Sequence, residues 1–148
     1  MALKHTNDGR CKKCQEIMDT FPGFYQPLRE WFTETQLLYL PEVHVSEAGR
    51  GEEKQEADFK AKTSKAHYGQ SAHNYNCALD LFELATGPTD IYNEKWFKEK
   101  LAPVLSIEID WYGRPGSVFR ELPHIEHKGW KDLVASGELK LVEPKKWK

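Results

Sequence analysis

Residues 71–82 read Ser-Ala-His-Asn-Tyr-Asn-Cys-Ala-Leu-Asp-Leu-Phe, a polar turn that leads directly into an apolar segment. The apolar part is typical of a β-strand and places Asp80 on the same face as Ala78 and Phe82. An ionised carboxylate in so apolar a strand is costly unless a cation or a hydrogen-bond donor meets it. His73 lies in the preceding turn and is a candidate to bind the same cation. A hydrogen bond to a loop, or an ion pair with Lys or Arg, would also explain Asp80.

A second polar segment, residues 121–127, reads Glu-Leu-Pro-His-Ile-Glu-His. Pro123 argues against a continuing helix, so this is not the helical HExxH arrangement of many zinc proteases. A turn at the proline could direct Glu121 and His124 to one point, and Glu126 shares a strand face with His124 and could orient it. A glutamate three residues before a histidine is common by chance, so this segment is informative only together with the first.

Outward from these two segments, the pattern mixes helices and strands without a regular βαβ rhythm. This mixture predicts an α+β fold. Helices are expected at residues 12–20, from Pro27 to just before Pro41, through 55–59, at 91–101 and at 129–136; strands are expected at 43–45, 77–82 and 104–111, with an extended segment at 118–126.

Length and charge limit the classes of protein that fit. The chain has 148 residues, 39% of them hydrophobic, which predicts one compact domain over residues 1–148. A net charge of −2 argues against a dedicated nucleic-acid binder. No apolar run has the length of a membrane span, and the polar N-terminus lacks the pattern of a signal peptide. We therefore expect a cytoplasmic protein with no membrane insertion.

The chain has three cysteines, which are too few for a disulfide framework. Cys11 and Cys14 form a CxxC motif without a second copy. Half of a zinc site or a redox pair is conceivable, but two reduced thiols at the start of a short helix is the simpler interpretation, and the role of the pair stays open.

Together the two polar segments resemble the family of zinc D-Ala-D-Ala carboxypeptidases and L-alanyl-D-glutamate endopeptidases, which includes vancomycin-resistance carboxypeptidases and many phage endolysins. The resemblance covers about residues 46–130. Two positions depart from the family pattern: Asn76 stands where a glycine is usual, and Ile125 where an aromatic residue is usual. The matching residues are Gly49, Arg50, Gln55, Ser71, His73, Ala78, Asp80, the stretch 111–113, Glu121, Pro123, His124 and Glu126.

The resemblance implies a fold and a site. The fold would be a small antiparallel sheet with flanking helices, as in Hedgehog and D-Ala-D-Ala peptidases. The implied roles are Zn²⁺ ligation by His73, Asp80 and His124, general base catalysis by Glu121, stabilisation of the substrate carbonyl or oxyanion by Arg50, and substrate binding by Ser71.

The resemblance also implies a substrate, the stem peptide of bacterial peptidoglycan. The sequence Gly69-Gln70-Ser71 is typical of the endolysin branch, so we expect an L-alanyl-D-glutamate endopeptidase that degrades the cell wall. We expect it to be a monomer and to stay in the host cytoplasm until lysis. Three alternatives remain: a D-alanyl-D-alanine carboxypeptidase, a non-catalytic cell-wall or virion module on the same fold, and a structural zinc protein. A structural zinc protein would need four protein ligands, whereas this pattern offers three ligands and a free carboxylate.

Overall fold

The computed structural model describes residues 3–85, 87, 93–113 and 121–142. Its centre is a four-stranded sheet in the order β1-β2-β4-β3, in which every neighbouring pair is antiparallel. The strands are β1 (Val43–Glu47), β2 (Ala78–Glu83), β3 (Ile109–Trp111) and β4 (His124–His127).

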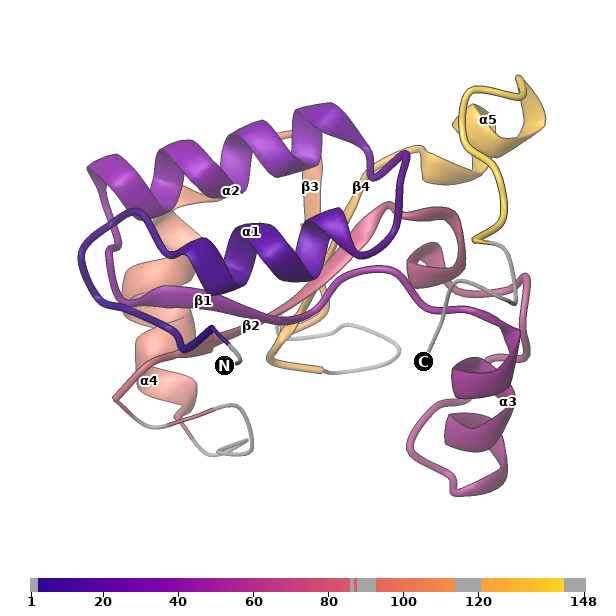
Figure 1. The fold of residues 1–148 in the computed structure, drawn as a ribbon, viewed down its shortest axis with the longest axis horizontal. Helices are drawn as coiled ribbons and strands as arrows, with labels where there is room; N and C mark the ends of the chain where they lie inside the picture. The colour runs from indigo at the N-terminus through magenta and orange to yellow at the C-terminus, as the bar shows by residue number, and fades with distance from the viewer. Residues whose placement is uncertain (1–2, 86, 88–92, 114–120, 143–148) are drawn as a thin grey trace.

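Helices flank this sheet (Figure 1), which confirms the predicted α+β class. They are α1 (Lys12–Asp19), α2 (Gln26–Leu38), α3 (Glu52–Lys60), α4 (Glu94–Trp96) and α5 (Trp130–Ala135), with two 3₁₀ turns, η1 (Ala72–Tyr75) and η3 (Ala102–Val104), and one π-helical turn, η2 (Phe97–Leu101). Among the described helices, none has the length and apolar character that a bilayer span requires.

Most elements lie where the sequence predicts them, but the strand expected over 104–111 begins only at Ile109. The helical path continues through η3 to Val104. A turn at Ser106 then separates helix from strand, because the Ser106 carbonyl accepts from the Ile109 N–H and its hydroxyl accepts from the Glu108 N–H. Of the other predictions, residues 91–92 and 118–120 lie outside the described residues.

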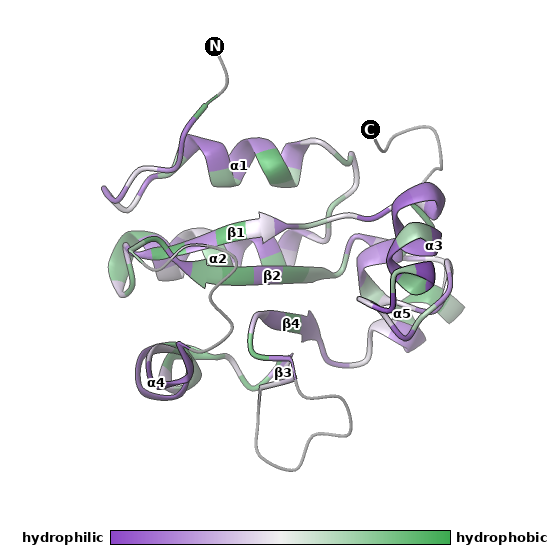
Figure 2. Cartoon of the chain, turned by 90° about the horizontal axis from the view of Figure 1, so that it is seen from below, coloured by the Kyte–Doolittle hydropathy of each residue, from purple (hydrophilic) through white to green (hydrophobic). Residues whose placement is uncertain are grey.

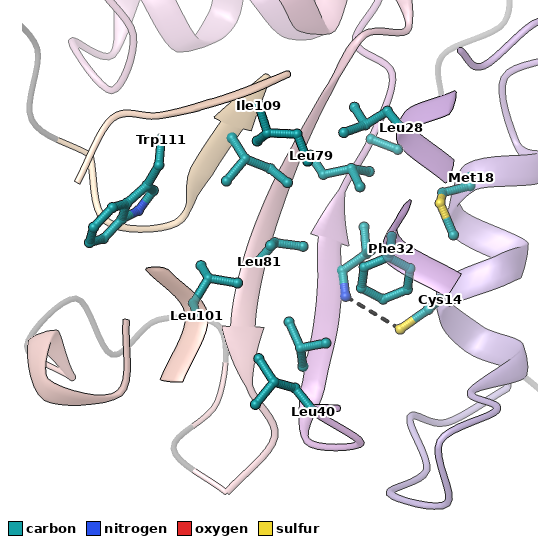
Figure 3. Packing of buried hydrophobic residues seen from close by; sticks show 14 of the residues in the cluster. Cys14, Met18, Leu28, Phe32, Leu40, Leu79, Leu81, Leu101, Ile109 and Trp111 are labelled. Atoms are coloured by element: carbon teal, nitrogen blue, oxygen red, sulfur yellow. Dashed lines mark hydrogen bonds between the residues drawn. The ribbon is translucent and has the colours of Figure 1, made fainter. Parts of the chain in front are cut away.

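The core lies between the sheet and helices α1 and α2 (Figure 3). Leu79 and Leu81 of β2 are fully buried beside Ile125 of β4, and Phe32 of α2 and Met18 of α1 are equally buried. Burying such a side chain contributes roughly 1.5–3 kcal/mol. This packing fixes β2 and β4 against each other, and these strands carry the polar residues described next.

Polar residues concentrate on β4, which Figure 2 colours as hydrophilic although the strand is largely buried. The register places His124 directly opposite Asp80 of β2. Glu47 pairs with Asp80 from the other side, next to a bulge in β1, an irregularity that often adjoins functional sites. Helices α3 and α5 lie at one end of the strands and α4 at the other (Figures 1 and 2). Buried polar groups need partners, so this part of the sheet is the candidate site.

Candidate metal centre

Three side chains that are far apart in sequence meet at this place. His73 comes from η1, Asp80 from β2 and His124 from β4, and one potential ligand atom of each lies within 4.8 Å of the others. Asp80 Oδ1 is 3.2 Å from His73 Nε2 and 3.3 Å from His124 Nδ1. The structure thus brings together the three residues that were predicted to hold a metal; their role as ligands stays a prediction.

The other nitrogen of each histidine has its own acceptor. His73 Nδ1 lies 2.6 Å from the carbonyl oxygen of Ala48, which can only accept, so Nδ1 carries the proton and Nε2 faces Asp80. His124 Nε2 lies 2.7 Å from Glu126 Oε1, which leaves Nδ1 for Asp80. Such outer acceptors fix the tautomer and orientation of metal-binding histidines. The interpretation of Glu126 as the group that orients His124 agrees with this contact.

The turn before β2 is held by local hydrogen bonds. Ser71 caps η1, and its hydroxyl accepts from the His73 N–H at 3.3 Å while the Asn74 side chain completes a capping box. Asn76 ends the turn in the left-handed region at φ 57°, as expected for an asparagine that replaces a glycine. Ser71 also lines the cleft, so the geometry allows both positioning of His73 and contact with substrate.

The electrostatics of the metal-free cluster favour a bound cation. Although burial opposes ionisation, the charges and hydrogen bonds of His73 and His124 hold the pKa of Asp80 well below its ordinary value. Burial likewise opposes charge on His124, but hydrogen bonds to Asp80 and Glu126 raise its pKa to about 9. The cluster therefore keeps a proton on His124 at neutral pH, at a place where a metal ion would supply the positive charge instead.

A cleft of about 810 Å³ opens beside the three side chains, all of which line it. Glu121 lines the same cleft and is exposed. The predicted turn at Leu122-Pro123 is present, because the His124 N–H donates to the Glu121 carbonyl at 3.3 Å. A titratable carboxylate and the three clustered side chains thus face one solvent-accessible space.

Arg50 also lines the cleft, but most of its donors already have partners. Its guanidinium bonds both carboxylate oxygens of Glu47, at 2.9 and 2.7 Å, and donates to Gln55 Oε1 at 3.1 Å. Its Nη2 lies 3.8 Å from Asp80 Oδ2. This anchorage fixes a buried positive charge beside Asp80.

Two aromatic residues, Trp130 and Tyr112, complete the site, and no role was predicted for either from the sequence. The Trp130 indole N–H donates to Glu126 Oε2 at 2.7 Å. The Tyr112 ring lies 4.5 Å from the His124 ring between centroids, and its hydroxyl is hydrogen-bonded to Glu126. No local pattern in the sequence marks these contacts, because they depend on how α5 and the end of β3 pack around the Glu126 carboxylate.

Comparison with known proteins supports the fold. No protein-family model matches the chain, and the search of curated proteins finds no match. Among solved structures, the chain is similar to the Serratia marcescens L-Ala D-Glu endopeptidase ChiX, with a TM-score of 0.64 and 17% sequence identity over 82% of this chain and 90% of that one. The two proteins share a fold. At this level of identity the likeness carries no residue roles, which rest on the geometry above.

Proposed function

We propose that this chain is a zinc-dependent peptidase that hydrolyses the L-Ala–D-Glu bond of peptidoglycan stem peptides. The observation that carries the proposal is the meeting of His73, Asp80 and His124 at the wall of a cleft that Glu121 also lines. The fold shared with an L-Ala D-Glu endopeptidase supports the choice of bond.

The donor set fits zinc. Two imidazoles and one carboxylate are ligands that Zn²⁺ accepts, and three protein ligands are the number found in catalytic zinc sites, which keep a position for water or substrate. The Ala48 carbonyl and the Glu126 carboxylate hold both imidazoles with one nitrogen turned inward. When bound, zinc supplies a Lewis acid that lowers the pKa of a water ligand and polarises a carbonyl.

The residues around the metal have distinct tasks in this proposal. Glu121 accepts a proton from the attacking water and returns it to the leaving amine. Glu126 keeps His124 in the required tautomer and is itself held by Trp130. Arg50 places a fixed guanidinium beside Asp80 and supports negative charge that develops on the substrate carbonyl oxygen.

The cleft also suits the substrate. Stem peptides carry carboxylates, and Lys65 and Lys131 line the cleft together with Arg50. A cleft of about 810 Å³ has room for several residues of an extended peptide.

The products from intact peptidoglycan test the proposal. Zinc-loaded protein is incubated with purified walls, and new termini are identified by mass spectrometry while turbidity is followed. We expect new N-terminal D-Glu and falling turbidity, lost on chelation and restored by zinc. Release of free D-Ala alone, at constant turbidity, would instead identify a carboxypeptidase. No new terminus from zinc-loaded protein would contradict a catalytic role altogether.

A further inference from the structure

A second group of metal-binding side chains lies away from the cleft, where the segment before α1 meets β1. It consists of His5, Cys11 at the start of α1, Cys14 in its first turn, and His44 of β1. One potential ligand atom of each lies within 4.8 Å of all the others. None of the four lines the cleft.

We propose that His5, Cys11, Cys14 and His44 bind one structural zinc ion that fastens the N-terminal segment and α1 to β1. Two thiolates and two imidazoles are the Cys₂His₂ donor set of structural zinc sites, which are four-coordinate and closed. Cys11, Cys14 and His44 are fully buried and His5 is half-buried, so the protein itself encloses the site.

Hydrogen-bond donors already surround the two sulfurs. The backbone N–H of Val45 points at Cys14 Sγ at 3.3 Å, drawn as a dashed line in Figure 3. The backbone N–H of Thr6 lies 3.4 Å from Cys11 Sγ, and Gln36 Nε2 lies 3.7 Å from Cys14 Sγ. A metal-bound thiolate accepts hydrogen bonds of this kind. These donors form the outer shell that a zinc–thiolate site requires.

The two histidines are placed like those of the cleft. Their ring centroids are 5.1 Å apart at 86°, compared with 4.9 Å and 71° for His73 and His124. His5 Nδ1 faces both sulfurs, at 3.4 Å from Cys11 Sγ and 3.5 Å from Cys14 Sγ. These are spacings of groups that share one tetrahedral ion.

His44 has a surplus of acceptors that a cation resolves. Its Nδ1 lies 2.7 Å from the Glu42 carbonyl oxygen and its Nε2 lies 2.6 Å from the Thr6 carbonyl oxygen. A neutral imidazole can donate to only one of these. Zinc held by Nε2 would leave Nδ1–H to donate to the Glu42 carbonyl, and would require the exposed Thr6 segment to give up its contact with Nε2.

Burial separates this interpretation from a redox role. A reactive CxxC pair needs an accessible thiolate, whereas both sulfurs here belong to fully buried residues. Zinc binding releases the protons of Cys11 and Cys14 to solvent, and the two thiolates neutralise the divalent ion. A closed neutral group of this kind contributes folding free energy rather than chemistry.

Metal content of full-length variants tests the proposal without any activity measurement. We expect His73→Ala protein to retain one zinc per chain, bound by the second group, and His73→Ala/Cys14→Ser protein to retain none. The matched control is His73→Ala/Cys77→Ser, which removes the third buried cysteine outside the group and should keep the zinc.

Cobalt substitution provides a second measurement that does not depend on how Cys14→Ser folds. Co²⁺ loaded into His73→Ala protein should show sulfur-to-metal charge-transfer absorption, and the further change His5→Ala, at a half-buried position, should weaken Co²⁺ binding by about 10-fold or more. A His73→Ala protein that contains no zinc and gives no such absorption would overturn the proposal, as would a Cys11–Cys14 disulfide in the freshly purified chain. Either result leaves the proposed peptidase function intact, because the cleft residues are tested separately.

Discussion

Two histidine pairs of similar geometry occupy different surroundings in this small protein. The pair His73 and His124 is joined by one carboxylate, Asp80, and faces a cleft that holds a further glutamate. The pair His5 and His44 lies beside two buried thiols and lines no part of that cleft. Three ligands with an accessible space permit chemistry, whereas four ligands in a closed space permit only binding. The number of donors and the access of water, rather than the histidines themselves, separate the two sites.

The groups that hydrogen-bond to the candidate ligand side chains also differ between the two sites. In the cleft they are acceptors, the Ala48 carbonyl and the Glu126 carboxylate, which hold imidazole protons. Around the cysteines they are largely donors, the N–H groups of Thr6 and Val45, which point at sulfur. Each shell is matched to the ligand type that it supports.

The largest expected effect is on Glu121, because in the proposed mechanism it contributes to the reaction and not to metal binding. Glu121→Gln should lower the rate of peptide hydrolysis by about 10²–10⁴-fold, the contribution typical of a positioned general base, and should leave zinc in both sites. Glu108→Gln, at another exposed glutamate, is the matched control and should keep full activity. Near-normal turnover of Glu121→Gln would move the base elsewhere, with Glu126 the first candidate.

Glu126→Gln should separate the two sites by metal affinity. The amide still accepts from His124 but lacks the negative charge by which a carboxylate makes the imidazole a stronger ligand, so zinc affinity in the cleft should fall by roughly 10–100-fold. Affinity in the cysteine-containing group should not change, since Glu126 does not contact it. Competition with a chromophoric chelator measures both. Equal loss at both sites would mean that the substitution disturbs the fold rather than His124.

Metal-free protein should lose stability at alkaline pH because of His124. Its pKa is raised to about 9 by Asp80 and Glu126 against the opposing effect of burial, so its contribution is complete below the ordinary value of about 6.5 and is lost as pH rises through about 9. Urea unfolding of chelated protein should show this alkaline decline, and His124→Gln should remove it.

His5, in the second group, should instead make the metal-free protein less stable at acid pH. Burial, and then the nearby charges of His44 and Lys13, lower its pKa to about 4, so its contribution is complete above about 6.5 and is lost as pH falls towards 4. In the same unfolding series, His5→Gln should flatten part of the acid decline and leave the alkaline decline unchanged. An alkaline decline that survives His124→Gln would show that another group is responsible.

The sequence predicts the cleft better than the second group, for a physical reason. His73 and Asp80 lie within one turn and strand, and Glu121 and His124 lie within another turn, so local spacing marks two separate candidates, which only the resemblance to a peptidase family joins into one site. The cysteine motif is equally local, but His5 and His44 join it only when β1 packs against α1, a contact between elements with no shared pattern. The contacts of Trp130 and Tyr112 with Glu126 are likewise tertiary. The late start of β3 was missed because the hydrogen bonds of Ser106 outweigh the strand preference of its neighbours.

Asn76 gives the smallest expected effect and tests the turn that positions the cleft ligands. Its φ of 57° lies in the region where an L side chain costs roughly 1–2 kcal/mol and where glycine costs nothing, and its Oδ1 is buried without a hydrogen-bond partner among the described residues. Asn76→Gly and Asn76→Ala both remove the side chain, so their difference isolates the backbone. We expect the alanine variant to have the lower free energy of unfolding, by about 1 kcal/mol, in urea denaturation.

The same pair at Ser136 is the control, because this exposed residue has a right-handed conformation at φ −79°. There alanine should be more stable than glycine, by about 0.5–1 kcal/mol. Since Asn76 ends the turn that contains His73, the alanine variant should also weaken zinc binding in the cleft, while the cysteine-containing group keeps its metal. Equal stability of the two Asn76 variants would mean that the turn relaxes without cost, and the position of His73 would then depend on its Ala48 contact rather than on the left-handed residue.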